Sequence, residues 1–510
     1  MLNKTYSTKI NVAANFVSSF WNALLGIIFV PFYLKYVGIE AYGLIGIFSS
    51  IQGFISLLDF GLSPTFNREI ARLSALSDKT QEMHDLKRTL EVSNWILATG
   101  IAIFLFAVSP LLAHYWLNPQ DLSLKTITMA LIIMSLNVSI QFSSGFYIGG
   151  LLGLQKQLSL NVVNIMCGTL RSVGALIVLA FVSSTIEAFL LWQTVIAVLQ
   201  FILIGMALSN ALPSAPRKPA FRKTILRGIW RYAAGMTGIT IVSLVLTQTD
   251  KIVLSRMLDL KTFGYYTLAV TISNMGIMPI VSSINNATYP KFNGYVSVSN
   301  EISLRSFYHQ SCQIMSVILI PVIIILALFS YQTLFIWTGS EEIAENTYLI
   351  LSLLAIGTGF NGLMWIPYHL QLAYGWTKLP FYINIGAICI LVPLIIFSVY
   401  YYGATGAAAS WVFLNGSYIV VTIQIMHLRL LKGEKLKWYF EDLLVPLCVA
   451  LPVAGLGKLF VKFDSNRYKT FLILAIISSI TFFLTMLSTK ASREILLTLK
   501  MRMLRVKTNL

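Results

Sequence analysis

The sequence has few charged residues and few cysteines, and each shortage excludes a class of protein. Only 11% of its 510 residues are charged while 56% are hydrophobic, which excludes an ordinary soluble domain. The four cysteines stand apart in apolar stretches, so they predict neither a disulfide framework nor a thiolate metal site. No GxxxxGK[ST] loop occurs, so nothing indicates ATP-driven transport within this chain.

Long apolar segments instead follow one another along almost the whole chain. A bilayer core about 30 Å thick is crossed by roughly 20 apolar residues in a helix. Segments of that kind predict an all-α integral membrane protein with about 14 transmembrane helices. The predicted spans are 10–36, 40–66, 91–117, 123–149, 159–183, 186–208, 232–256, 263–290, 306–335, 345–373, 377–402, 405–430, 441–462 and 466–489.

Lys and Arg fall almost entirely in every second gap between these spans. With a cytoplasmic N-terminus, 27 of the 37 lie on the cytoplasmic side, seven on the outer side and three inside spans. Cytoplasmic loops are enriched in Lys and Arg, so this asymmetry predicts an inner-membrane protein with both termini in the cytoplasm. The net charge of +17 is then explained by topology and by contact with anionic lipid headgroups, and no nucleic-acid partner is expected.

Two short outer turns indicate an internal repeat. Tyr42-Gly43 ends the first turn, and Phe263-Gly264 ends a similar turn about 221 residues later. Six spans per repeat put both copies in one orientation, as in parallel-repeat transporters. The predicted parts are an N-terminal six-helix lobe at 1–208, a basic cytoplasmic linker at 209–231, a C-terminal six-helix lobe at 232–430, two additional spans at 431–490 and a basic cytoplasmic tail at 491–510.

Polar residues recur at helical spacing inside several predicted spans. Steps of three and four place them on one face of each helix. Uncharged Ser, Thr and Asn on such faces commonly hold packed membrane helices together, which is the simpler explanation for most of them. The stripes are Asn11, Asn15, Ser18 and Asn22 in the first span; Ser49, Gln52, Ser56, Asp59 and Ser63 in the second; Asn161, Asn164, Gly168 and Arg171 in the fifth; and Thr240, Ser243, Thr247 and Asp250 in the seventh.

Three charged residues on these stripes favour a functional interpretation. An ionised group at bilayer depth costs at least about 2.5–3.5 kcal/mol, so it normally faces a cavity or a partner. Asp59, Arg171 and Asp250 each lie on a stripe, which predicts that the stripes face a shared aqueous interior. The predicted substrate-binding residues of this cavity are Arg171, Lys251, Asp250, Asp59, Asn161, Asn164, Gln52 and Asn22.

Arg171 is the strongest candidate for binding an anion. Its guanidinium is permanently charged and presents a planar fork of donors to phosphate oxygens. A buried ion pair with Asp59 or Asp250 is the structural alternative. Those two carboxyls are also candidates for H⁺ or Na⁺ coupling, and neither a cofactor nor a metal is expected. Lys251 either faces the cavity or extends toward the outer interface.

Four basic residues near cytoplasmic span ends are candidates for guiding an anionic headgroup inward. They are Arg68, Arg72, Lys291 and Arg305. A purely topogenic role is the simpler explanation for each.

Several fragments occur in order on the predicted spans. They are Asn15-Phe-Val-Ser, Phe32-Tyr-Leu-Lys-Tyr-Val-Gly-Ile-Glu-Ala-Tyr-Gly-Leu, Leu57-Leu-Asp-Phe-Gly-Leu, Gly153-Leu-Gln-Lys and Thr249-Asp-Lys-Ile-Val-Leu. Together they resemble Wzx-type flippases for O-antigen or capsule repeat units, members of the multidrug/oligosaccharidyl-lipid/polysaccharide exporter superfamily. The resemblance covers residues 10–430.

This resemblance implies two six-helix lobes around a central cavity that opens alternately to either side. The implied substrate is an undecaprenyl-pyrophosphate-linked oligosaccharide, moved from the cytoplasmic to the outer leaflet of a bacterial inner membrane, with a proton or sodium gradient as driver. Membrane lipids, a glycan polymerase and the chain-length machinery are further candidate partners. The two extra spans resemble the lipid II flippase branch, in which additional helices offer a groove for the prenyl tail.

Two other functions stay open at this point. A drug/cation antiporter of the same fold would have a cavity dominated by carboxylates, which Arg171 and Lys251 oppose. A membrane-embedded glycan polymerase or ligase would need catalytic groups on a substantial outer loop, whereas the longest predicted outer gap is 336–346. No enzymatic activity is therefore expected.

Overall fold

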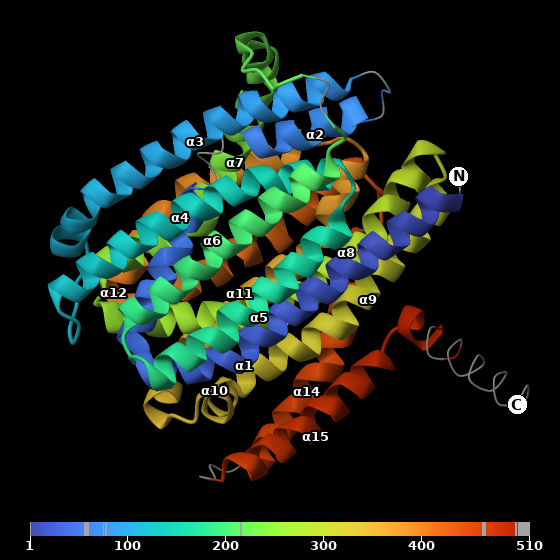
Figure 1. Ribbon diagram of the computed structural model, residues 1–510. Helices are drawn as coiled ribbons and strands as arrows, with labels where there is room; N and C mark the ends of the chain where they lie inside the picture. The colour runs from blue at the N-terminus through green and yellow to red at the C-terminus, as the bar shows by residue number, and fades with distance from the viewer. Residues whose placement is uncertain are drawn as a thin grey trace, which may run out of the picture. The chain divides into compact units, whose positions relative to one another are not determined.

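The computed structural model describes residues 2–55, 61–74, 76, 79–214, 217–461, 466–494 and 497, and the side chains of 2–10, 12–13 and 227–243 lie outside that description. The described residues are almost entirely helical and include no strand (Figure 1). They fall into two compact units, Met1–Gly264 and Tyr265–Leu510. The predicted lobe boundary at the linker stays a prediction.

The first unit is built on two pairs of long helices that run parallel to each other, as the order of their contacts along the chain shows. One helix pair is α1 with α5 and the other is α4 with α6, and α3 packs beside α4 (Figure 1). Buried Leu, Ile and Phe side chains of α2 to α6 form its core. The elements are α1 (Leu2–Ile55), α2 (Leu62–Ser74), α3 (Thr80–Leu111), the π-helical turn η2 (Leu112–Trp116), α4 (Leu124–Gly153), α5 (Gln157–Phe181), α6 (Ile186–Ala211) and α7 (Lys223–Met257).

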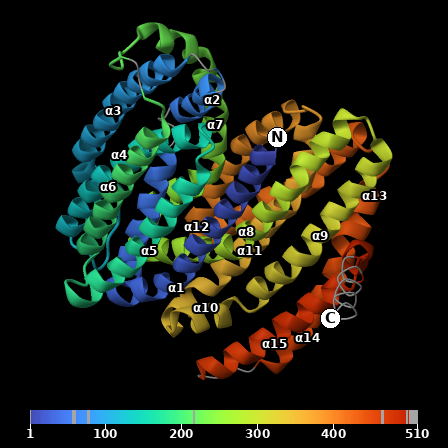
Figure 2. The ribbon, with the colours of Figure 1, turned by 45° about the vertical axis from the view of Figure 1, so that its right-hand side comes forward.

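The second unit is arranged around α9, which packs against α11, α14 and α15. The last two helices lie side by side and run together, as Figure 2 shows. Its core draws on all of these helices and on α12. The elements are α8 (Leu260–Ser297), which begins in the first unit, α9 (Glu301–Leu328), α10 (Ser330–Thr338), α11 (Glu341–Ala373), α12 (Lys378–Arg429), α13 (Lys435–Lys437), the π-helical segment η3 (Trp438–Leu444), α14 (Val445–Phe460) and α15 (Arg467–Met486).

Within the described residues, 11 helices are long and apolar enough to cross a membrane. Two of these stretches, Ala14–Ile55 and Lys378–Arg429, contain 42 and 52 residues. At 1.5 Å per residue they would be roughly 63 and 78 Å long, which is at least twice the thickness of a bilayer core of about 30 Å. Each bends at a glycine with a positive φ, Gly38 at 81° and Gly403 at 56°. The all-α membrane class is confirmed, and the described helices are compatible with about 14 spans.

The second predicted span is not helical throughout. The sequence predicts one helix over 40–66, whereas Gly61 has a positive φ of 70° and α2 begins just after it, at Leu62; residues 56–60 lie outside the described residues. The short helix α2 then packs closely on α4. A Cβ added to Gly149 would lie 2.7 Å from the carbonyl oxygen of Ser63, so the small residues of α4 permit this approach.

The two repeated outer turns contact each other reciprocally. A Cβ on Gly43 would lie 2.5 Å from the carbonyl oxygen of Leu260, and a Cβ on Gly264 would collide with the carbonyl oxygen of Ile39. Both pairs are related by the same offset of 221 residues. In a two-fold contact residue i meets j while j meets i, so this geometry supports the internal repeat.

We expect Gly264→Ala to destabilise the protein, because the new methyl group meets backbone that cannot rotate away. Overpacking of this kind typically costs about 1–3 kcal/mol. The measurement is thermal unfolding in detergent. Gly294→Ala is the matched control, since Gly294 lies on the same helix with no heavy atom within 4 Å of an added Cβ. Equal melting temperatures for the two variants would show that the reciprocal contact is not tight.

Candidate functional site

Arg171 is held by amide side chains inside the first unit. It lies on α5 about 21 Å from the start and 15 Å from the end of that helix, and its side chain is half-buried. Its Nη2 donates to Oε1 of Gln200 on α6 at 2.7 Å, and Nε2 of Gln200 donates to Oδ1 of Asn164 at 3.0 Å. Among the described residues no carboxylate lies within 4.0 Å of the guanidinium. Its Nε is buried and has no acceptor in the described part of the chain.

The remaining polar residues of α1 and α5 mostly bind each other. Asn161 Nδ2 donates to Oδ1 of Asn15 at 2.5 Å, and Asn15 in turn donates to Gln157 at 2.8 Å. Asn22 donates to the carbonyl oxygen of Ser18 at 2.8 Å and packs against Gly168. These hydrogen bonds join α1 to α5, which favours a role in helix–helix packing for these residues. A substrate-binding role for Asn161 and Asn22 stays a prediction.

Gln52 belongs to a second polar cluster in the same unit. Its Nε2 donates to Gln141 at 2.6 Å, Gln141 donates to Asn137 at 2.5 Å, and Asn137 donates to Oγ1 of Thr194 at 3.1 Å. Gln52 and Gln141 line a cavity of about 280 Å³, together with Ser63 of α2. Thr194 and Gln200 lie on different faces of α6, so this helix carries the Gln52 cluster on one side and the Arg171 cluster on another.

The amides of α4 and α6 were missed at the level of sequence. Asn137 and Gln141 are four residues apart and share a helix face, which is the signal that could have identified them. Gln200 has no such partner on its own helix, and only the packing of α5 against α6 reveals its contact with Arg171.

Asp250 and Lys251 occupy different surroundings on α7. Both side chains are half-buried. Lys251 lines a mostly apolar cavity of about 280 Å³ with Ser50 and Phe54 of α1 and Trp116 of η2. It lies six residues, or about 9 Å, before the end of α7. Asp59, the other predicted ion-coupling carboxyl, lies outside the described residues.

The predicted entrance residues are already engaged with protein groups. Arg68 and Arg72 both contact the carboxylate of Glu69, at 2.7 and 2.8 Å. Burial raises the pKa of this carboxyl, but the hydrogen bonds and charges of the two guanidinium groups outweigh it, and the pKa is lowered. Glu69 is therefore ionised at neutral pH, and the three residues together keep one net positive charge.

The other two entrance residues lie in the second unit. Lys291 is placed 5.3 Å from the centre of the Phe307 ring. Arg305 contacts Glu434 at 3.3 Å and Glu301 at 3.8 Å. A role for either in substrate entry stays a prediction.

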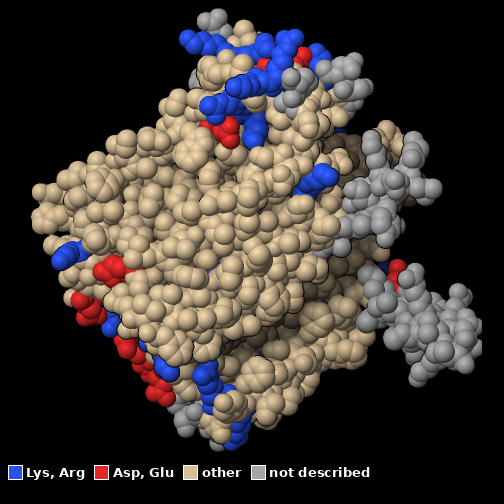
Figure 3. All heavy atoms as spheres, in the orientation of Figure 1, with Lys and Arg blue, Asp and Glu red and all other residues tan. Residues whose placement is uncertain are grey.

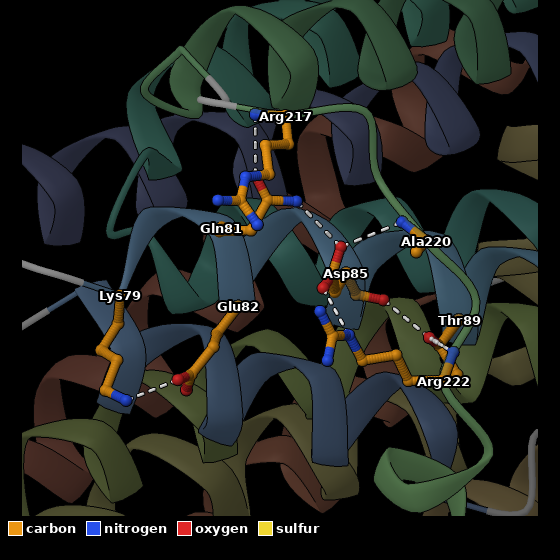
Figure 4. A network of polar contacts seen from close by, with 8 residues as sticks. All are labelled: Lys79, Gln81, Glu82, Asp85, Thr89, Arg217, Ala220 and Arg222. Atoms are coloured by element: carbon orange, nitrogen blue, oxygen red, sulfur yellow. Dashed lines mark hydrogen bonds and ion pairs between the residues drawn. The ribbon is translucent and has the colours of Figure 1, made fainter.

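The basic linker is hydrogen-bonded to the first turns of α3. The buried carboxylate of Asp85 accepts hydrogen bonds from Gln81 at 3.0 Å, from the Ala220 amide at 2.9 Å and from Nε of Arg222 at 2.6 Å (Figure 4). The Arg222 amide donates to Thr89 at 2.9 Å. Figure 3 shows Lys and Arg gathered over this end of the unit, next to a broad uncharged face. This is the separation expected of a membrane protein with a basic cytoplasmic rim.

A buried charged cluster joins the C-terminal helices to α9. His309 is 3% exposed and lies between two carboxylates, with Nδ1 2.5 Å from Asp442 and Nε2 3.1 Å from Glu434. Both ring nitrogens therefore lie at hydrogen-bond distance from a carboxylate oxygen. Gln313 donates to Asp442 at 3.0 Å and accepts from the Ala491 amide at 3.2 Å. Arg305 extends the cluster through its contact with Glu434. Sequence reasoning did not identify it, because its members are more than 120 residues apart.

A comparison with known protein families shows which family the chain belongs to. Residues 9–296, more than half of the chain, match the family described as "Polysaccharide biosynthesis protein". The chain belongs to this family.

Known relatives of this polysaccharide biosynthesis protein agree with that assignment. It is 25% identical over 409 residues to a Shigella flexneri protein named "Putative O-antigen transporter", covering 77% of this chain and 93% of the relative. The fold is similar to that of lipid II flippase MurJ in an inward closed conformation, with a TM-score of 0.68, 15% identity and coverage of 91% of this chain and 97% of MurJ. An inward-facing MATE family multidrug transporter gives a TM-score of 0.63 at 16% identity, covering 81% and 94% of the two chains. The resemblance stated from the sequence is confirmed, and the chain is a multi-pass membrane protein.

Proposed function

We propose that this polysaccharide biosynthesis protein is a flippase. It moves an undecaprenyl-pyrophosphate-linked oligosaccharide from the cytoplasmic to the outer leaflet of a bacterial inner membrane by alternating access between the lobes at 1–208 and 232–430. Both termini lie in the cytoplasm in this proposal. The name and the 93% coverage of the O-antigen transporter relative support it.

The observation that carries the proposal is the environment of Arg171. A permanent cation deep in a membrane-spanning helix is expensive unless it has a function or a partner. Among the described residues its side-chain partner is the neutral Gln200, so its charge is not cancelled there by an ion pair. A pyrophosphate fits such a group, whereas a cationic drug would be repelled.

The polar clusters around Arg171 and Gln52 suit a sugar headgroup better than an apolar cargo. Amides both donate and accept hydrogen bonds, as sugar hydroxyl groups do. In this proposal Lys251 and Asp250 belong to the same substrate path, Asp250 and Asp59 couple the movement to H⁺ or Na⁺, and the basic residues Arg68, Arg72, Lys291 and Arg305 guide the headgroup inward.

An apolar pocket gives the prenyl chain a place outside the polar interior. It has a volume of about 420 Å³ and lies among α8, α9 and α15, lined by residues that include Gly276, Ile325 and Phe482. Hydrocarbon placed there stays away from water, which is favourable for a long prenyl tail. We assign this pocket to the carrier lipid, with α14 and α15 as the helices that shield it.

The proposal is tested by deleting the gene and locating the lipid-linked oligosaccharides with a membrane-impermeant label on spheroplasts. We expect complete repeat units to accumulate beyond the reach of the label, because they remain on the cytoplasmic leaflet. Complete repeat units on the outer face, left unpolymerised, would contradict a flippase and favour a polymerase or ligase. Restoration of labelling by the wild-type gene is the control.

A further inference from the structure

A pocket in the second unit contains two buried polar atoms without a hydrogen-bond partner among the described residues. It lies between α11 and the two arms of α12, has a volume of about 230 Å³ and is lined by ten residues, none of them charged. Three aromatic rings contribute to its wall, those of Trp365, Tyr368 and Tyr418. The space equals roughly eight times the 30 Å³ share of a water molecule in the liquid, so it admits one compact polar group rather than a long chain.

Two of its acceptors are unpartnered. The Oε1 atom of Gln371 and the Oγ1 atom of Thr422 are shielded from solvent and have no hydrogen-bond partner within the described residues. Gln371 is 1% exposed and Thr422 is 8% exposed. A buried acceptor without a donor costs about 1–3 kcal/mol, so both atoms favour a ligand that brings hydroxyl or amide hydrogens.

The remaining amides of the pocket are oriented by protein contacts. Asn361 accepts from Nε1 of Trp365 at 3.2 Å and donates to Asn415 at 2.9 Å. Asn384 accepts from the hydroxyl group of Tyr418 at 3.3 Å. These bonds fix the aromatic side chains beside the amides, and a wall fixed in advance loses little entropy when a ligand binds.

The chemistry of the lining selects the ligand class. The pocket has no charged residue that could pair with a pyrophosphate or a cationic drug. A hydrocarbon could not form hydrogen bonds with its amides. A sugar ring presents an apolar C–H face to an aromatic ring and hydroxyl groups at its edge. We infer that this pocket binds one uncharged sugar ring of the translocated glycan. The inference rests on the proposed function and assigns sugar selection to a site separate from Arg171.

The position of the pocket suits this role. Gln371 lies two residues before the end of α11, and Pro380 lies two residues after the start of α12. In the proposed topology this turn is cytoplasmic, so the pocket lies near the side from which the glycan enters.

The test compares two lipids on the purified full-length protein in nanodiscs, with binding followed by tryptophan fluorescence. One probe is undecaprenyl pyrophosphate carrying the repeat unit isolated from the deletion strain, and the other is undecaprenyl pyrophosphate without sugar. We expect the double variant Gln371→Met/Thr422→Val to bind the glycan-bearing lipid at least tenfold more weakly, since two hydrogen bonds are lost. Its affinity for the bare lipid should equal that of the wild type.

Folding does not confound this comparison. Oε1 of Gln371 and Oγ1 of Thr422 have no partner in the described part of the chain, so removing these two oxygens does not break a hydrogen bond of the fold. Tyr382→Leu is the matched control, because Tyr382 is 68% exposed on the same helix and does not line the pocket. Equal loss of affinity for both lipids, or for neither, would overturn the sugar site. A wild-type protein that binds neither lipid would contradict the proposed function itself.

Discussion

Asp442→Leu should detach the C-terminal helices from the rest of the second unit. The substitution leaves the imidazole of His309 and the amide of Gln313 without their buried partner. Removing one partner of a buried ion pair typically costs about 3–5 kcal/mol, which is a large part of the stability of most proteins. We expect a clear fall in the melting temperature of the purified protein and faster proteolysis after residue 430.

Two controls separate this effect from a general loss of charge. Glu441→Leu removes a neighbouring carboxylate that is exposed, and it should leave the melting temperature nearly unchanged. The double variant His309→Leu/Asp442→Leu replaces both buried polar partners by apolar groups, which can be neutral or stabilising, and should recover part of the loss. A single variant as stable as Glu441→Leu would show that the cluster does not hold α14 and α15 in place.

Arg171→Ala should reduce glycan export at least tenfold while leaving the amount of protein in the membrane unchanged. Hydrogen bonds to a charged group contribute about 1.5–3 kcal/mol, and each 1.4 kcal/mol is a factor of ten in affinity. The fold should tolerate the change, because Gln200 and Asn164 keep their mutual hydrogen bond. Surface glycan and immunoblotted protein are measured in the complemented deletion strain.

Arg171→Lys then distinguishes charge from geometry. A lysine keeps the positive charge but loses the planar fork that binds two oxygens at once, so we expect intermediate export. Lys125→Ala is the control, since Lys125 is an exposed cation of the first unit and should export normally. Normal export by Arg171→Ala would remove this residue from the substrate site.

The fold class and the outer turns followed from local sequence signals. The membrane determines where apolar runs and Lys and Arg residues occur along the chain. The spans can therefore be predicted from these patterns without knowledge of any tertiary contact. The aromatic–glycine turns at Gly43 and Gly264 were likewise identified in advance, because the two short turns resemble each other in sequence at an offset of about 221 residues. Their mutual contact is the additional information that the structure supplies.

The polar partners could not be predicted in the same way. For Arg171 the sequence offered anion binding or an ion pair with Asp59 or Asp250, whereas its described partner is Gln200, which a neighbouring helix presents. The Asn15–Asn161 pair lies on the predicted stripes, but spacing alone does not tell whether a stripe faces a cavity or another helix. The non-helical conformation of Gly61 lies between Gln52 and α2, and a continuous polar stripe in the sequence did not reveal it. Helix pairing decides each case, and pairing is a long-range property.

The most direct test of the central claim is a transport measurement with the purified protein in liposomes. Undecaprenyl pyrophosphate carrying the repeat unit is placed in the inner leaflet of the vesicles. An H⁺ or Na⁺ gradient is imposed, and sugar that reaches the outer leaflet is detected with an impermeant label. The proposed function predicts that the label reaches the lipid only in vesicles that contain the protein, and more slowly with Arg171→Ala. Unchanged labelling of protein-containing and empty vesicles under both gradients would contradict it.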